Sequence, residues 1–144
     1  MKALKPFATI IIAILASVTT AYAVTTSEQL ELIDGLKSIV DYYPSHENDM
    51  SGSLGEYDEE TESFPFTRNK EYSLVAVCDD DCTDLDLYVY DKNGKVVGYD
   101  DDDTATAIVD FTAEYSGDYD VEVTMYECET SVCFYRVRSY RYSD

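Results

Sequence analysis

The stretch Asp84-Leu85-Asp86-Leu87-Tyr88-Val89-Tyr90-Asp91 alternates apolar and polar side chains. Successive side chains of a β-strand point to opposite faces, so Leu85, Leu87 and Val89 form one apolar face and the residues between them form a polar face. The same alternation returns over residues 118–126. A strand with one apolar and one wet face is typical of an antiparallel sheet that covers a core with one side only.

Outward from these two stretches, short β-branched and aromatic runs recur at intervals near ten residues, separated by turn residues such as Lys92-Asn93-Gly94 and Ser116-Gly117. No helical periodicity interrupts them, which excludes a parallel α/β sheet. The sequence therefore predicts an all-β antiparallel sandwich over residues 63–144. The expected strands are 63–67, 71–78, 85–91, 95–99, 106–112, 118–126 and 133–142.

The last expected strand carries Arg136, Arg138 and Arg141, which are most of the positive charge of this region. Opposite charges on neighbouring strands stabilise a sheet. We therefore expect these arginines to pair with the acidic residues of 118–126, in a structural rather than a ligand-binding role.

The residues before the sandwich have helical spacing. Apolar side chains recur at intervals of three and four from Leu30 until Pro44, and Thr25 with Glu28 forms a capping-box pattern. The sequence predicts one amphipathic helix over residues 24–44. Its acidic side chains argue against a lipid surface, so it is expected to pack on its own sandwich or on another protein.

The segment between helix and sandwich, residues 45–62, loses apolar periodicity. It is rich in Ser, Gly, Asp and Glu, which is the composition of a solvated connection. We expect a flexible acidic linker here.

Residues 1–23 have the features of a secretory signal peptide. Two lysines precede the apolar run 7–18, and Ala21-Tyr22-Ala23 has the small-x-small pattern that signal peptidase reads. The run is shorter than the roughly 20 residues of a membrane-spanning helix. We expect cleavage after this pattern. The mature protein should then be periplasmic or secreted, with no attachment to the membrane.

The chain has 30 Asp and Glu against 10 Lys and Arg, a net charge of −20 over 144 residues. Nucleic acid binding requires a basic surface, and an anionic membrane repels a polyanion, so both partners are excluded. Hydrophobic residues make up 45% of the chain and include 14 Tyr, which is enough apolar material for a core.

All four cysteines, Cys78, Cys82, Cys128 and Cys133, follow the expected signal peptide, in the part of the chain that reaches an oxidising compartment. The short spacings favour the pairs Cys78–Cys82 and Cys128–Cys133 among the three connectivities that four cysteines allow. The same spacings suit a four-thiolate zinc site, which is the alternative.

The stretch 84–91, with Asn93-Gly94-Lys95-Val96-Val97, Val109-Asp110-Phe111-Thr112-Ala113 and Ser116-Gly117-Asp118-Tyr119, resembles the bacterial pre-peptidase C-terminal domain and the collagen-binding modules of bacterial collagenases. The resemblance covers about residues 60–142. It implies a small jelly-roll β-sandwich and a non-catalytic binding or accessory role, often with calcium near acidic strand ends.

Carboxylates at three neighbouring places are candidate calcium ligands: before the strand 85–91, within it, and after the next hairpin. Calcium takes about six to eight oxygen ligands, which clustered acids can supply. The candidate metal ligands are Asp79, Asp81, Asp84, Asp86 and Asp101. No known calcium-loop pattern is met, so repelling, solvated acids are the alternative.

No catalytic constellation stands out, because the chain has one His and no nucleophile motif, Gly-rich phosphate loop or zinc-protease motif. We expect a protein that is not an enzyme, with calcium as its one possible cofactor. One expected role is a free-standing module that contacts a protein or an extracellular polymer through tyrosines. The other is a chaperone-like or secretion-accessory protein that docks a partner through the helix 24–44. The tyrosines of the expected binding face are Tyr88, Tyr90, Tyr99, Tyr119, Tyr126, Tyr135, Tyr140 and Tyr142.

Overall fold

The computed structural model describes residues 25–143, apart from the side chains of His46 and Glu47. Its elements are α1 (Thr26–Ile39), β1 (Tyr42–Leu54), β2 (Glu59–Phe66), β3 (Glu71–Cys78), β4 (Cys82–Tyr90), β5 (Val96–Asp100), β6 (Thr106–Thr112), β7 (Gly117–Cys128) and β8 (Cys133–Tyr142). The predicted signal peptide, residues 1–23, lies outside the described residues. Within residues 25–143, no helix is long and apolar enough to cross a membrane.

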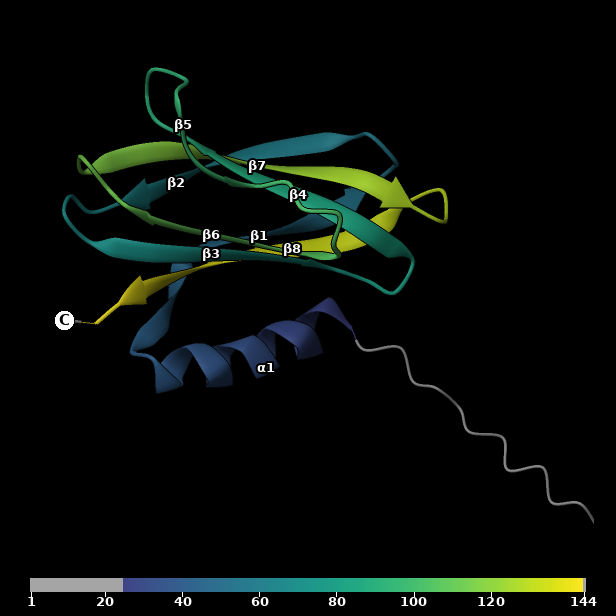
Figure 1. The fold of residues 1–144 in the computed structure, drawn as a ribbon, viewed down its shortest axis with the longest axis horizontal. Helices are drawn as coiled ribbons and strands as arrows, with labels where there is room; N and C mark the ends of the chain where they lie inside the picture. Colours follow the sequence, from purple (N-terminus) through teal and green to yellow (C-terminus); the bar gives the residue numbers. More distant parts are fainter. Residues whose placement is uncertain (1–24, 144) are drawn as a thin grey trace, which may run out of the picture.

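Two four-stranded antiparallel sheets pack face to face (Figure 1). The strand order is β1-β8-β3-β6 in the first sheet and β2-β7-β4-β5 in the second. The pairs β1–β8, β2–β7, β3–β6 and β4–β5 are all antiparallel. This is the jelly-roll arrangement of two Greek keys, so the predicted all-β sandwich with one preceding helix is confirmed.

The core lies between the two sheets and follows the alternation in the sequence. Leu85, Leu87 and Val89 of β4 are fully buried, and so are the corresponding residues of β7, the neighbour of β4. Those residues of β7 are Val121, Val123 and Met125. The residues between them therefore form the outer face of the second sheet.

The sandwich begins earlier than the sequence predicts. Residues 45–54 belong to β1 and residues 59–62 to β2, so the expected flexible linker is wrong. β1 buries Met50 and Leu54, but a register shift between Pro44 and Asp49 interrupts the two-residue period that would have revealed a strand.

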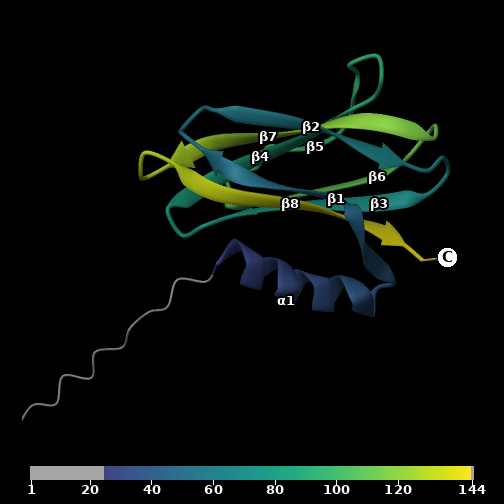
Figure 2. The ribbon, with the colours of Figure 1, turned by 180° about the vertical axis from the view of Figure 1, so that it is seen from behind.

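The helix α1 packs on its own sandwich, the first of the two predicted alternatives. It begins with the predicted capping box, in which Thr25 and Glu28 exchange backbone and side-chain hydrogen bonds. Figures 1 and 2 show α1 lying along the outer face of the β1-β8-β3-β6 sheet. Leu30 is fully buried there in a small cluster with Val75 and Tyr140.

A polar network also joins α1 to this sheet. Arg138 of β8 donates to Asp34 of α1 at 2.9 Å and to Asp49 of β1 at 2.7 Å. The expected pairing of the β8 arginines with residues 118–126 is wrong, because β8 lies between β1 and β3 in the other sheet. Arg138 instead fastens the helix to its own sheet.

Candidate functional site

The two sheets differ in what covers them. α1 covers the outer face of the β1-β8-β3-β6 sheet, whereas no element within residues 25–143 covers the outer face of the β2-β7-β4-β5 sheet (Figure 2). The four strands of this uncovered sheet contain no Lys or Arg. Their acidic residues are Glu59, Glu60, Glu62, Asp84, Asp86, Asp100, Asp118, Asp120, Glu122 and Glu127.

We call the outward side chains of this sheet the acidic face. Alternation along each strand and the strand register decide which residues belong to it. They are Glu59, Thr61, Ser63, Pro65, Asp84, Asp86, Tyr88, Tyr90, Val96, Tyr99, Asp118, Asp120, Glu122, Thr124 and Tyr126. The acidic face is therefore a broad surface made mostly of carboxylates, hydroxyls and tyrosine rings.

A row of three tyrosines crosses the acidic face. The ring centroids of Tyr88 and Tyr99 lie 5.8 Å apart, those of Tyr88 and Tyr90 lie 6.3 Å apart, and both pairs are stacked. The Tyr90 hydroxyl donates to Glu122 at 3.0 Å. Burial, with this hydrogen bond, raises the pKa of Tyr90 to about 12. The row thus presents aromatic surface that stays uncharged at neutral pH.

At one end of the acidic face, carboxylates surround a hollow of about 300 Å³, which we call the acid pocket. It is lined by Asp84, Asp86, Tyr88, Asp101, Asp103 and Tyr126. These residues come from β4, from β7 and from the loop after β5. Segments that are distant in the sequence therefore build a single negative site.

Asp84 is the most deeply placed carboxylate of the acid pocket. Its side chain is 6% exposed, and its Oδ1 has no hydrogen-bond partner among the described residues. Burial raises the pKa of Asp84, and the charges of Asp103 and Glu127 raise it further. A buried carboxylate without a donor or a cation is energetically unfavourable, so this group marks a place where positive charge would be stabilised.

Asp86 lies in a similar environment. Burial, together with the charges of Asp84 and Asp101, raises its pKa to about 6. The pKa values of Asp84 and Asp86 are both shifted upwards, because both groups lose solvent and face the charges of other carboxylates.

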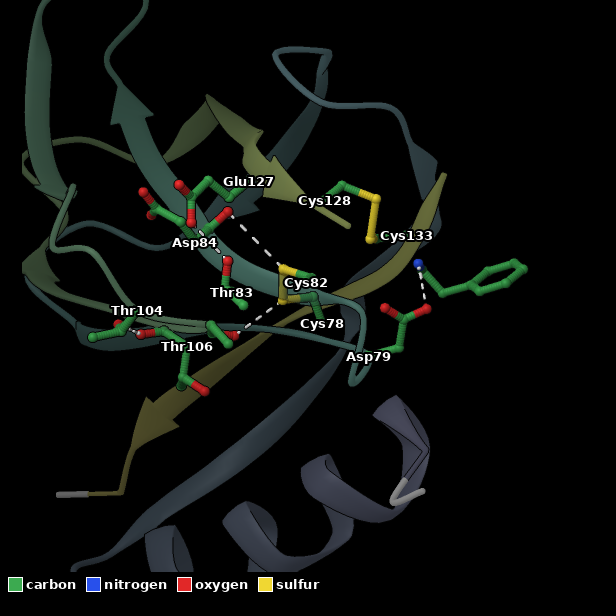
Figure 3. Close-up of a disulfide and its surroundings, with 12 residues drawn as sticks. Cys78, Asp79, Cys82, Thr83, Asp84, Thr104, Thr106, Glu127, Cys128 and Cys133 are labelled. Carbon is green, nitrogen blue, oxygen red and sulfur yellow. Dashed lines mark hydrogen bonds between the residues drawn. A yellow bond between two sulfur atoms is a disulfide. The ribbon is translucent and has the colours of Figure 1, made fainter. Parts of the chain in front are cut away.

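Two disulfides close the end of the sandwich that carries the acid pocket (Figure 3). Cys78–Cys82 spans the turn between β3 and β4, and Cys128–Cys133 spans the turn between β7 and β8, as the spacings predict. All four cysteines are thereby bonded, which rules out the zinc alternative. Disulfides persist in oxidising compartments, so the protein is extracytoplasmic.

The structure brings together three of the five predicted metal ligands. Asp84, Asp86 and Asp101 line the acid pocket, together with Asp103, which the sequence analysis does not single out. Within residues 25–143, no three His, Cys, Asp or Glu side chains form a group that could hold a metal ion. Calcium binding stays a prediction.

The other two predicted ligands lie elsewhere. Asp79 accepts a hydrogen bond from the backbone N–H of Phe134 at 2.8 Å, across the Cys78–Cys82 disulfide from Asp84 (Figure 3). The backbone oxygen of Asp81 accepts from the N–H of Glu129 at 2.8 Å. Both residues therefore help to shape the stapled turns.

The predicted tyrosine-rich face divides in the structure. Tyr88, Tyr90, Tyr99 and Tyr126 lie on the acidic face. Tyr119, Tyr135 and Tyr140 are buried instead, and Tyr142 packs against Tyr42 at the far end of the molecule. Half of the expected tyrosines therefore contribute to stability or local packing rather than to this surface.

A larger hollow, of about 560 Å³, is lined by Tyr43, Pro44, Ser45, Lys70, Arg141, Tyr142 and Ser143. Its lining includes Lys70 and Arg141 and no carboxylate, so its charge is opposite to that of the acid pocket. It is also remote from the acidic face, because it lies against the β1–β8 pair of the other sheet.

No protein-family model and no curated protein matches the chain. The resemblance to the bacterial pre-peptidase C-terminal domain is therefore wrong. The alternation of residues 84–91 arises in any strand that covers a core with one side and meets water with the other, so it does not identify that family.

Among solved structures, the chain is similar to PliG of Aeromonas hydrophila, a periplasmic lysozyme inhibitor of g-type lysozyme. The identity is 13% and the TM-score is 0.47, over 65% of this chain and 83% of the other. The chain is an extracytoplasmic, disulfide-bonded jelly-roll protein.

Proposed function

We propose that the protein is a non-catalytic binding protein, periplasmic or secreted, whose acidic face binds a positively charged protein. One observation carries the proposal: a whole outer sheet face is uncovered, acidic and lined with tyrosines, and its strands hold no Lys or Arg. Charge complementarity accelerates encounter and selects the partner, while tyrosine rings supply contact area at a protein interface.

The energetics favour a cationic partner over a neutral polymer. Like charges clustered on one face repel one another, and the overall charge of −20 adds to this repulsion. A positively charged surface removes the repulsion on binding, whereas a neutral chain leaves it in place. The tyrosine row alone would suit either partner, but the carboxylates around it suit only the first.

Titration against a panel of proteins of similar size tests the proposal. The panel contains basic proteins, with a g-type lysozyme, the enzyme that PliG inhibits, among them. Acidic proteins are the negative controls. We expect one or more basic proteins to bind, with an affinity that falls as salt rises, because salt screens exposed charges. Absence of binding by every basic protein, or equal binding by acidic ones, would overturn the proposal.

A pair of charge-matched variants locates the surface. Glu59→Gln/Glu122→Gln removes two charges from the acidic face, and Glu31→Gln/Asp41→Asn removes two charges from α1 and from the turn that follows it. The first variant should weaken binding by about fivefold to tenfold, and the second should leave it nearly unchanged. Equal losses would show that net charge alone attracts the partner.

A second candidate function rests on the outward side of α1. Leu32, Leu36, Ile39 and Val40 recur at helical spacing and are each more than half exposed. We propose that the apolar surface of a partner protein docks on this stripe, so that the chain acts as an accessory protein to that partner. Leu32→Ser/Leu36→Ser should then abolish a salt-insensitive interaction while leaving the melting temperature unchanged. Point variants are preferable to removal of the helix, because Leu30 is buried in the sandwich.

A further inference from the structure

We infer that the acid pocket anchors one guanidinium group, the side chain of an arginine of the cationic partner. The inference rests on the proposed function and names the chemistry recognised at one end of the acidic face. The argument begins with Asp84, which is more than nine-tenths buried, lines the acid pocket and leaves its Oδ1 without a donor among the described residues. A cation that enters the acid pocket lies beside this buried, unpaired carboxylate and stabilises its charge.

The dimensions of the acid pocket favour an organic cation. A hollow of about 300 Å³ corresponds to roughly ten liquid waters. A calcium ion needs oxygen ligands about 2.4 Å away on all sides, and within residues 25–143 no three acidic side chains meet in that way. A guanidinium bridges more widely spaced carboxylates, because its five N–H donors spread over a planar fork.

Two walls of the acid pocket are aromatic. Tyr88 and Tyr126 line it, and a cation over a tyrosine ring gains cation–π attraction that neither water nor a carboxylate provides. Tyr88 is held in the stacked row with Tyr99, and Tyr126 is held edge-on by Tyr57 at 5.4 Å. A planar guanidinium can stack on such a ring while its edge faces the carboxylates, whereas an ammonium group cannot.

Covalent bonds and hydrogen bonds within the chain hold the walls of the acid pocket in place. The Cys78–Cys82 and Cys128–Cys133 disulfides hold the ends of β4 and β7, where Thr83 donates to Glu127 at 2.8 Å. The loop that carries Asp101 and Asp103 is tied down, because the N–H of Leu85 donates to the oxygen of Thr104 at 2.9 Å. A preformed site loses less entropy on binding, which strengthens recognition of a single side chain.

The test is an NMR titration of the isotope-labelled protein with Nα-acetyl-arginine methylamide. The comparison ligands are the citrulline analogue, which has nearly the same shape without charge, the lysine analogue, and calcium chloride at equal ionic strength. We expect saturable shifts confined to the amides of 84–88, 101–104 and 126 with the arginine compound. The citrulline compound should cause none, and the lysine compound should bind several-fold more weakly.

Two variants remove one charge each. Asp84→Asn should weaken arginine binding by about tenfold, and it is expected to fold because a neutral amide of the same shape replaces a buried carboxylate. Asp41→Asn is the matched control, since Asp41 is exposed in the turn between α1 and β1 and does not belong to the acidic face. Equal weakening in both variants would overturn the inference.

The remaining outcomes separate this inference from the proposed function. Shifts at the same amides with calcium alone and none with arginine, or shifts spread evenly over the acidic face, would overturn the guanidinium site. If Asp84→Asn binds a basic protein as well as the native chain does, while Glu59→Gln/Glu122→Gln does not, the inference fails and the proposed function stands. If the native protein binds the arginine compound but binds no basic protein, the guanidinium site stands and the proposed function fails.

Discussion

Arg138 of β8 donates from Nη1 to Oδ2 of Asp34 at 2.9 Å, joining two residues that lie 104 positions apart in the sequence. The other oxygen of the same carboxylate accepts from the Tyr140 hydroxyl at 2.7 Å. Both donors lie on the sheet and the acceptor lies on α1. Asp34 is therefore one polar attachment point of the helix, beside the bonds of Gln29 and Lys37 to β3 and the apolar contact made by Leu30.

Asp34→Ala should lower the free energy of unfolding by about 2 kcal/mol, because it removes the acceptor of the buried Tyr140 hydroxyl and one of the two carboxylates that pair with Arg138. Urea denaturation measures the loss. Glu31→Ala is the control, since Glu31 is exposed on the same helix. Similar values for the two variants would mean that the network does not hold α1.

The raised pKa of Asp86 should make the stability of the protein depend on pH. Its pKa is about 6 in the folded protein against an ordinary value of 3.8, so between these values the folded state binds more protons than the unfolded state. The free energy of unfolding therefore falls as pH rises from about 4 to about 6, by about 1–2 kcal/mol after solvent screening is considered. Urea denaturation across this range measures the slope.

The same slope should be smaller in Asp86→Asn, which cannot titrate, and that variant should be the more stable protein at neutral pH. Asp118→Asn removes the same unit of charge outside the acid pocket and should keep the native slope. Identical slopes in all three proteins would attribute the pH dependence to net charge.

The disulfides should stabilise local structure more than the whole fold. Each closes a loop of only a few residues, which corresponds to about 2 kcal/mol in the chain-entropy model. Cys128→Ser/Cys133→Ser should lower the melting temperature modestly and increase amide exchange around the β7–β8 turn, with the sandwich still formed. A non-reducing peptide map of the native protein should show the two local pairs, and loss of all near-ultraviolet circular dichroism in the variant would contradict this expectation.

Two glycines should respond in opposite directions to alanine. A Cβ at Gly98 would lie 2.5 Å from the Val109 side chain, so Gly98→Ala forces the sheets apart locally and should destabilise by about 1–3 kcal/mol. A Cβ at Gly35 meets nothing within 4 Å, so Gly35→Ala should stabilise α1 by up to about 1 kcal/mol. Thermal unfolding of both variants shows whether each melting temperature rises or falls. A lower melting temperature for Gly35→Ala would show that a neighbouring group occupies the space around residue 35.

Elements in which local chemistry agrees with the fold could be predicted from the sequence. The capping residues Thr25 and Glu28 start the helix, and β3, β6 and β8 have the predicted bounds because turn residues border them. β1 was missed for a physical reason. It is an edge strand with a register shift, and apart from Met50 and Leu54 its alternation is carried by polar and small residues.

The acid pocket could be predicted only in part. Alternation places Asp84 and Asp86 on one face of a strand, and that pattern is local. The approach of Asp103 and Tyr126 depends on which strands flank β4, and strand order is a property of the whole chain. The partners of Arg138 were mispredicted for the same reason, because β7 precedes β8 in the sequence but belongs to the other sheet.

The position of β1 has a consequence for the order in which the protein forms. β1 is hydrogen-bonded only to β8, so the first strand of the chain finds its partner in the last. α1 has the same dependence, since Arg138 and Tyr140 also belong to β8. Long-range pairing of this kind forms late and slowly. β1 and α1 therefore become fixed in place only after β8 is available, which makes the joining of these N-terminal elements to the sheet a late step of folding.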